Sequence, residues 1–412
     1  MGMDFSMDKH DFEYLRALAG QVAELAARPE QSRLAEQWRL HNQLADRRPL
    51  VFCDPEHGWQ EILRPELLKT ASPLARQWEL GLRKRIYHAE VLRDDFVVDG
   101  RFSVPILAES TGWGLQIQHI GEREGQAYRV KPVIEDYERD FPKLRYPQTV
   151  VDGPGSDRLL ELAHQVFDGL LVVERRMSWW WSLGLTNHYI DLRGLENFLC
   201  DLVLEPEWVH RMMDFLCEGA LGAIDWLEQQ GLLYQNTGNH YVGSGGFGFT
   251  DELPPVNGRR VTPMDMWGFV ESQETVSISP EMYGEFVFPY HRRIAERFGL
   301  NCFGCCEPYE GRWRYARQLP RLRRVSCSPW SDRRKMPEHL GDRYIASIKL
   351  NPSPLSRPVM DEAFVRDELR QALEYSRSCV PELIMKDNHT LGGNPRNAAR
   401  WVEIAREEID RL

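Results

Sequence analysis

The sequence contains no run of about 18 or more apolar residues, the length that a membrane-spanning helix needs. Its first residues, MGMDFSMDKHDF, have neither the cationic start nor the apolar stretch of a secretory signal. Positive charge is also scarce, because 62 Asp and Glu oppose 51 Lys and Arg and leave a formal net charge of −11. We therefore expect a cytoplasmic protein that binds neither a membrane nor nucleic acid.

A disulfide framework is not expected either, since thiols stay reduced in the cytoplasm. The eight cysteines are then core residues, metal ligands or reactive thiols. We expect simple burial for Cys53, Cys200, Cys217 and Cys379. The stretch NCFGCCEP at 301–308 is different, because it places three cysteines within five residues, next to a glutamate.

Helix and strand patterns alternate through the C-terminal half. SPEMYGEFVFPYHRRIAERFG (279–299) predicts an amphipathic helix with Ser279 as its N-cap and Pro280 at its first position. The next predicted elements, in chain order, are a strand ending in the cysteine cluster, a helix at 312–318, the strand RRVSCS, a helix at 335–340, the strand YIASIKL, a helix at 361–378, the strand ELIMKD and a closing helix. Such βα units in series predict a parallel sheet.

Three upstream stretches, FSVPILAES, LLVVERR and LLYQN, also read as strands, which brings the count to about seven, close to the eight of a closed barrel. The predicted fold class is therefore α/β, a (β/α)8 TIM barrel with an N-terminal helical extension and insertions. We expect the extension at residues 1–80, packed on a barrel at 81–412, and an irregular insertion near 112–150.

The glycine-rich stretch HYVGSGGFGFTDELPP is expected to be a long loop kept for a function. It lacks the spacing of G-x-G-x-x-G, and no Lys-Ser/Thr completes a phosphate-binding loop, so nucleotide binding is not supported.

Functional side chains of a (β/α)8 barrel lie at the carboxyl ends of its strands. Every strand candidate here ends on polar groups, so we expect these groups to share one mouth. A catalytic zinc site uses three protein ligands and one open position, and thiolates with His or a carboxylate suit it. The candidate metal ligands are Cys305, Cys306, Glu307, Cys327 and His389. Buried packing of the cysteines is the alternative.

Other residues near strand ends are candidates for substrate binding. Trp180 follows a strand candidate within WWW (179–181), where it can wall an aromatic pocket. In MWGFVESQE, Trp267, Glu271 and Gln273 are expected near a helix start. His240 and Asn351 follow strand candidates. Core packing is again the alternative for the tryptophans.

The stretch DMWGFVESQETVSISPEMYGEFVFPYHRRIAERFGLNCFGCCEP, followed by RRVSCSPWSD, IKLNPSP and IMKDNHT, resembles the uroporphyrinogen decarboxylase superfamily, specifically its members related to corrinoid-dependent methyltransferases. The resemblance runs from about residue 50 to the end of the chain. It implies a TIM barrel with zinc held by His and Cys at the mouth. The arginine-bearing N-terminal signature of true porphyrinogen decarboxylases has no counterpart in RRPLVFCDPEHGW.

The H-x-C of the methyltransferase branch appears here as Gly304-x-Cys306, so its histidine is missing. Glu307 or Cys305 would take that place, with Cys327 or His389 completing the ligand set. This departure leaves the exact ligands open.

These residues lead to one principal functional hypothesis. The chain is expected to move a methyl group from a small substrate, such as a methoxylated aromatic, to a corrinoid (cobalamin) on a separate partner protein, with Zn²⁺ as Lewis acid. His389, Asp387, Lys349 and Glu307 are the expected catalytic residues, which orient substrate or transfer protons. A metal-free decarboxylase or lyase using Lys386, Asp387 and His389, and a corrinoid- or tetrapyrrole-binding protein, are the alternatives. The oligomeric state, including a homodimer, is left open.

Overall fold

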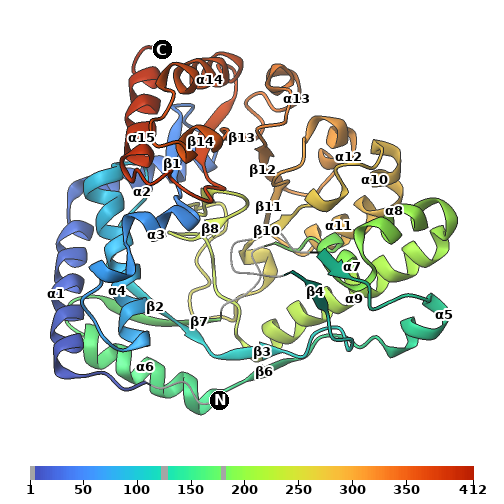
Figure 1. Ribbon diagram of the computed structural model, residues 1–412, viewed down its shortest axis with the longest axis horizontal. Coiled ribbons are helices and arrows are strands. Elements are labelled where there is room, and N and C mark those ends of the chain that lie inside the picture. Colours follow the sequence, from blue (N-terminus) through green and yellow to red (C-terminus); the bar gives the residue numbers. More distant parts are fainter. Residues whose placement is uncertain (1–4, 122–128, 178–181) are drawn as a thin grey trace.

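A computed structural model of the chain describes residues 5–121, 129–177 and 182–412. Its centre is a parallel six-stranded sheet in the order β1-β14-β13-β12-β11-β10 (Figure 1). The strands are β1 (Leu50–Cys53), β10 (Trp267–Val270), β11 (Leu300–Phe303), β12 (Leu322–Cys327), β13 (Ile345–Lys349) and β14 (Val380–Met385). Two more strands, β2 (Arg101–Ile106) and β7 (Val172–Met177), pair with each other in parallel.

The prediction of an α/β fold built on parallel strands is thus confirmed. Among the described residues no hydrogen-bonded ladder joins the β2–β7 pair to the six-stranded sheet, so a closed barrel is not shown.

Helices lie around the outside of the sheet in Figure 1. Those that alternate with the last strands are α10 (Pro280–Phe286), α11 (Phe288–Ala295), α12 (Trp313–Ala316), α13 (Met336–His339), α14 (Glu362–Tyr375) and α15 (Arg396–Ile409). Alternate strand residues, among them Val51, Val270, Phe303, Val325 and Leu383, enter the large core shared with these helices. Both faces of the strands are buried, which is why their sequences read as continuous apolar runs.

The helix predicted at 279–299 is interrupted. Ser279 caps it as expected, since its Oγ accepts the Met282 N–H at 3.1 Å. However, the helix breaks at Val287, and Pro289 lies in the first turn of α11. Proline has no N–H to donate to the preceding turn, so a new helix begins there.

The N-terminal region forms a second core with the β2–β7 pair. It contains α1 (Lys9–Ala26), α2 (Pro29–Asn42), α3 (Trp59–Ile62) and α4 (Pro73–Tyr87). Together with α6 (Gly153–Phe167), α1 and α4 bury Leu15, Val22, Leu82, Val104 and Phe167. The division at residue 80 stays a prediction, and β1, which precedes it, pairs with β14.

The segment predicted to be an irregular insertion contains short elements. The strands β4 (Gln118–Ile120) and β5 (Arg129–Lys131) form an antiparallel pair, followed by the short helix α5 (Tyr137–Asp140). Strands β3 (Ala108–Ser110) and β6 (Thr149–Val151), also antiparallel, lie at the two ends of the segment.

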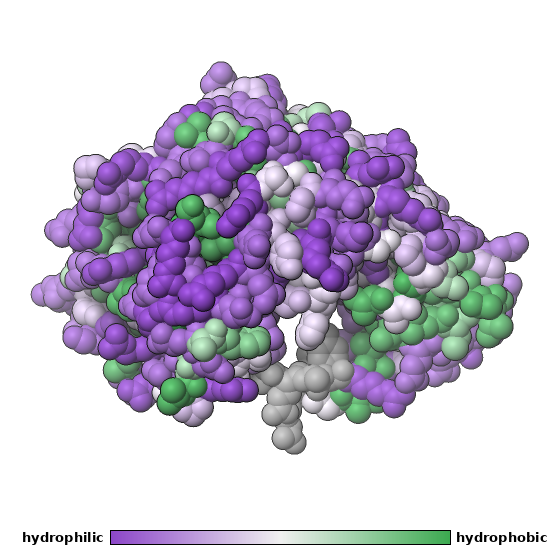
Figure 2. Space-filling view, turned by 90° about the horizontal axis from the view of Figure 1, so that it is seen from above, coloured by the Kyte–Doolittle hydropathy of each residue, from purple (hydrophilic) through white to green (hydrophobic). Residues whose placement is uncertain are grey.

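Three helices follow β7: α7 (Thr186–Arg193), α8 (Leu195–Leu204) and α9 (Pro206–Gln230). Figure 2 shows hydrophobic residues gathered on the right of the molecule, the side where α8 lies in Figure 1. Leu195, Val203 and Leu204 of α8 are exposed. Such apolar surface often marks an interaction site, and the question of a homodimer stays open. None of the described helices is long and apolar enough to cross a bilayer.

One predicted element was wrong, because LLYQN (232–236) is not a strand. MWGFVESQE begins with strand β10, which was not expected, and the predicted helix start is found at Gln273, the first residue of a short 3-10 helix (Gln273–Thr275). The Asn236 side chain explains the missing strand, because its Oδ1 accepts the Trp267 N–H (2.8 Å) and its Nδ2 donates to the Trp267 carbonyl (3.0 Å). A side-chain amide therefore satisfies the edge of β10 where a neighbouring strand would otherwise pair.

The glycine-rich stretch is a hairpin packed against the inward side of the sheet, formed by β8 (Tyr241–Val242) and β9 (Gly246–Phe247). Figure 1 shows β8 among the central strands. A Cβ at Gly243 would press on Cys302, and one at Gly246 would overlap Arg324. Close approach to the sheet explains these glycines, so this segment fills the interior instead of forming an open loop.

Replacing Gly248 by Ala is expected to lower the free energy of unfolding by about 1–3 kcal/mol, the usual cost of overpacking. A Cβ there would overlap the backbone oxygen of Asn236, which cannot rotate away. Urea denaturation followed by circular dichroism measures the change. Gly222→Ala in α9, where a Cβ meets no atom within 4 Å, is the control and should be neutral or stabilising. Equal stability of both variants would contradict the packing described here.

Candidate functional site

The carboxyl ends of β1, β11 and β14 bring two thiols, a lysine and two carboxylates together. Lys386, just after β14, lies 2.9 Å from Asp387 Oδ1 and 3.7 Å from Glu56 Oε1. Burial lowers its pKa, but the opposite charges around it prevail, so the pKa is raised and the ammonium group is kept. Cys305 and Cys306 follow β11, and the Lys386 charge acts on both thiols. This group contains three of the predicted site residues: Cys305, Cys306 and Asp387.

The two thiols lie within hydrogen-bond distance of each other. Their sulfur atoms are 3.6 Å apart, and Ser244 Oγ donates to Cys305 Sγ at 3.3 Å. A hydrogen bond from Cys305 lowers the pKa of Cys306 despite burial, and the same bond together with burial raises the pKa of Cys305. Since Cys305 is buried and Cys306 is only half-buried, the accessible, reactive sulfur is that of Cys306.

The two carboxylates that flank Lys386 stand on strained backbone. Glu56 (φ 48°) and Asp387 (φ 61°) both adopt the left-handed conformation that favours glycine. Burial raises the pKa of Glu56 to about 7, where Asp387 and Asp54 add to the rise and Lys386 opposes it. Strained non-glycine residues concentrate at functional sites. Glu56 is thus a group that can exchange a proton near neutral pH, and the sequence interpretation missed it.

Glu307 lies completely buried beneath this group. Its Oε1 accepts the Ser272 N–H and its Oε2 accepts the Cys305 N–H, both at 2.8 Å. Arg312 Nη1 is 3.8 Å from Oε1. With both oxygens engaged, Glu307 ties the ends of β10 and β11 together and does not face the opening, contrary to its predicted catalytic and ligand roles.

A second buried acid is Glu271, to which the sequence interpretation assigned no role. It accepts hydrogen bonds from Ser182 Oγ (2.8 Å) and from the Gln273 N–H (3.0 Å). Burial, reinforced by the charges of Glu307 and Glu274, raises its pKa well above the ordinary value. Gln273, a predicted substrate ligand, thereby supports this acid through its backbone. The position of Glu271 directly after a strand was the available signal.

Cys327 is not brought to the thiol pair. Side chains alternate along a strand, and Ser326 points toward the site, where its Oγ donates to the Cys305 carbonyl at 2.8 Å. Cys327 therefore enters the outer core shared with the helices, where burial raises its pKa.

Lys349 faces inward but lies buried, donating to Ser347 Oγ at 2.7 Å. Burial lowers its pKa to about 8, although the nearby Glu382 favours the charged form. Glu382 in turn pairs with Arg324 at 3.0 Å. Lys349 is therefore a lysine that loses its proton close to neutrality.

The remaining predicted residues are dispersed. His389 is exposed, and its ring stacks on that of His57 with centroids 5.5 Å apart. His240 contacts Arg176, and burial, with the Arg176 charge, lowers its pKa to about 3. Trp267 is buried and donates to the Gly248 carbonyl at 3.0 Å.

Asn351 accepts the Ser353 N–H at 3.0 Å and so closes a local turn. Trp180 lies outside the described residues.

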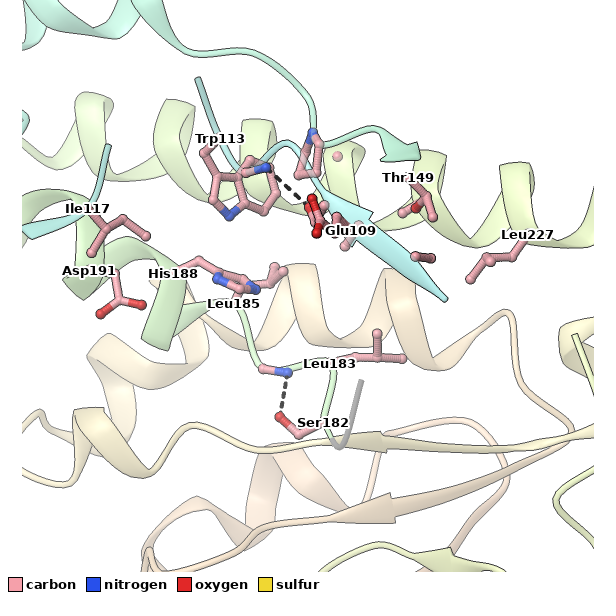
Figure 3. Close-up of a pocket in the computed structure, with 18 of the residues that line it drawn as sticks. Glu109, Trp113, Ile117, Thr149, Ser182, Leu183, Leu185, His188, Asp191 and Leu227 are labelled. Atoms are coloured by element: carbon pink, nitrogen blue, oxygen red, sulfur yellow. Dashed lines mark hydrogen bonds between the residues drawn. The ribbon is translucent and has the colours of Figure 1, made fainter. Parts of the chain in front are cut away.

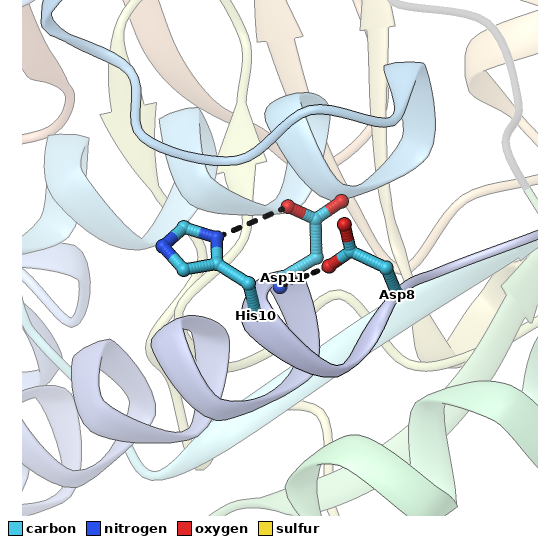
Figure 4. A group of neighbouring side chains, drawn as sticks. All are labelled: Asp8, His10 and Asp11. Atoms are coloured by element: carbon cyan, nitrogen blue, oxygen red, sulfur yellow. Dashed lines mark hydrogen bonds and ion pairs between the residues drawn. The ribbon is translucent and has the colours of Figure 1, made fainter.

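A single group of three potential metal ligands within 4.8 Å of one another occurs in the described part of the chain, formed by Asp8, His10 and Asp11 (Figure 4). Local structure explains it, since Asp8 caps α1 through the Asp11 N–H (2.8 Å) and Asp11 accepts the N–H groups of Ala71 and Ser72. The predicted cysteine–histidine set does not form such a group. The 3.6 Å between the sulfurs nevertheless fits two thiolates on one tetrahedral zinc, where bonds of about 2.3 Å place sulfurs about 3.8 Å apart.

No family model and no curated protein matches this chain. A solved structure does match: a methyltransferase from Methanosarcina mazei, with a TM-score of 0.51 and 11% sequence identity. The match covers 91% of this chain and 98% of the methyltransferase. At this identity the likeness shows that the two chains share their overall fold, and no more.

Replacing Cys305 by Ala is expected to raise the pKa of Cys306, because the hydrogen bond that stabilises the thiolate is removed. Alkylation of Cys306 by iodoacetamide, followed by mass spectrometry across pH 6–10, should then reach its midpoint at higher pH. Cys200 of α8 is exposed, so the burial predicted for it was wrong. Cys200→Ala removes this distant thiol and should leave the profile unchanged. An unshifted midpoint in the Cys305 variant would refute the stabilising hydrogen bond from Cys305 to Cys306.

Proposed function

We propose that this chain is a methyltransferase component that moves a methyl group from a small substrate to a corrinoid on a separate protein. The observation that carries the proposal is the thiol pair beside Lys386 at the carboxyl end of parallel strands, in a chain that shares the fold of a methyltransferase. We also propose that β1, β2, β7 and β10 to β14 are the strands of a (β/α)8 barrel, because reactive groups of that fold gather at this end.

The residues present fit a zinc ion in part. Cys305 and Cys306 would supply two sulfurs, and Asp387 or His389 the third ligand after a side-chain rotation. Glu307 and Cys327 are excluded from this set, because the oxygens of Glu307 are engaged and Cys327 faces the helices. The ion would act as a Lewis acid on the atom that carries the methyl group.

Protein groups beside the thiols would stabilise and protonate the anion that methyl transfer creates. As the methyl group passes to the corrinoid, the electrons of the broken bond stay on the substrate's oxygen or sulfur. The Lys386 ammonium, held by Asp387 at 2.9 Å, stabilises that anion. Glu56, whose pKa is about 7, supplies a proton to it.

Metal analysis of protein purified without chelators is expected to find about one zinc per chain, lost in the Cys305→Ser, Cys306→Ser double variant. Cobalt(II) substitution provides a second readout, because thiolate ligands give a sulfur-to-cobalt charge-transfer band. Cys327→Ala should keep both signals. Zinc-free wild-type protein that still demethylates substrate would exclude the metal.

Mixing the protein with reduced cobalamin and methoxylated aromatics, while the cobalt absorption bands are followed, separates methyl transfer from mere corrinoid binding. Binding without methylation of the cobalt would favour a delivery protein.

A second candidate function is a metal-free decarboxylase or lyase, favoured by the buried Lys349 with its pKa of about 8. A neutral lysine can attack a ketone carbonyl, lose water and form an imine that accepts electrons from a breaking C–C bond. The positive charge of Lys386 acts on Lys349 and disfavours its ammonium form. Asp387 and His389 would lie near the substrate's carboxylate.

Reductive trapping tests this candidate. Incubation with pyruvate and cyanoborohydride should add mass to Lys349, at a rate that rises through about pH 8 as its ammonium loses a proton. Lys349→Met should abolish the adduct, while Lys335→Met, at an exposed position, should not. Unmodified Lys349 in folded protein would remove this candidate.

A further inference from the structure

A cavity of about 500 Å³ lies between the β3–β6 pair, helix α9 and the segment 182–191 that follows β7 (Figure 3). Its size suits a small organic molecule. The walls are largely apolar, with Leu183, Leu185, Ala220, Ala223 and Leu227 among them. Neither the thiols nor Lys386 line it, so it is separate from the site described above.

The charged groups of this cavity have one sign. Glu109 on β3 and Asp191 on α7 line it, and no Lys or Arg does so among the described residues. Asp191 lies 3.5 Å from His119, a partner that neutralises it only when protonated. Burial lowers the pKa of His188, another lining residue, which therefore stays neutral. Nothing in the lining would neutralise an anionic ligand.

The other lining groups favour a positive charge as well. Ser182 donates its proton to the buried Glu271 (2.8 Å) and accepts the Gly184 N–H (3.1 Å), so its oxygen has one lone pair left for the cavity. Trp113 is buried in the wall, with its ring centroid 5.3 Å from that of His188. The faces of aromatic rings attract cations. Gly219 lets α9 approach, because a Cβ there would overlap the Trp113 ring.

We propose that this cavity binds a small organic cation, a quaternary or protonated amine with an apolar body. Trp113 and the aliphatic walls would hold the apolar groups, while Glu109 and Asp191 neutralise the charge at the rim. Aromatic carboxylates are disfavoured, because they would meet two like charges and, among the described lining residues, no Lys or Arg. This site goes beyond the proposed methyl transfer and does not require it.

Isothermal titration calorimetry of the full chain with choline tests the proposal, with 3,3-dimethylbutan-1-ol as the neutral isostere and 3,4-dimethoxybenzoate as the anion. Choline should bind at least about tenfold more tightly than either. The Glu109→Gln, Asp191→Asn double variant should lower choline affinity by about tenfold and leave the neutral isostere unaffected. Ala223→Leu, which fills the cavity, should weaken every ligand. Glu285→Gln, an exposed acid outside the lining, is the matched control.

Equal affinity for choline and its neutral isostere would show an apolar cavity without charge selection and overturn the proposal. Tighter binding of the anion, or no binding of choline at millimolar concentration, would do the same. The Cys305→Ser, Cys306→Ser double variant should bind choline as the wild type does, so failure of the zinc site and failure of this site are distinguished.

Discussion

The geometry of the thiol site depends on the buried carboxylate of Glu307. Its two oxygens accept the N–H groups of Ser272 and Cys305, which follow different strands, and thereby fix the ends of β10 and β11 relative to each other. Arg312 lies beside it and also donates to the Ser272 carbonyl at 2.9 Å, so the start of α12 joins the same network. Hydrogen bonds that backbone N–H groups donate to a buried carboxylate are strong, because no water competes for its oxygens. Glu307 thus holds the backbone that carries the two reactive sulfurs, without its own oxygens bonding to them.

The alternation of strands and helices after residue 279 could be predicted from the sequence because each strand is buried on both faces and each helix on one. Helix caps such as Ser279 and Asp361 are equally local signals. Strands are harder to predict from short apolar runs, since LLYQN and WGFV have similar patterns. Only the hydrogen bonds between Asn236 and Trp267 decide which of the two runs joins the sheet. Closure into a barrel could not be predicted in this way, because it depends on hydrogen bonds between strands that are distant in the sequence, and no local pattern signals them.

The site was partly predictable for the same reason. The sequence could name Cys305, Cys306 and Asp387 in advance, because they follow strands. The direction of the Cys327 side chain could not be predicted, because it depends on which alternate residues of the strand point inward, and the Ser326–Cys305 contact fixes that choice. Glu56 lies far from Lys386 in sequence and meets it only because β1 pairs with β14. Its position after the strand LVFC was the one available hint.

The interior hairpin has a consequence for access to the site. Its segment reaches from Phe247, packed on Trp38 and Phe52, to Ser244, which touches the Cys305 sulfur. This stretch therefore covers the Cys305 sulfur on the side of the sheet where Ser244 lies. A longer or shorter turn at Ser244 would thus alter the surroundings of Cys305 without any change in the strands themselves.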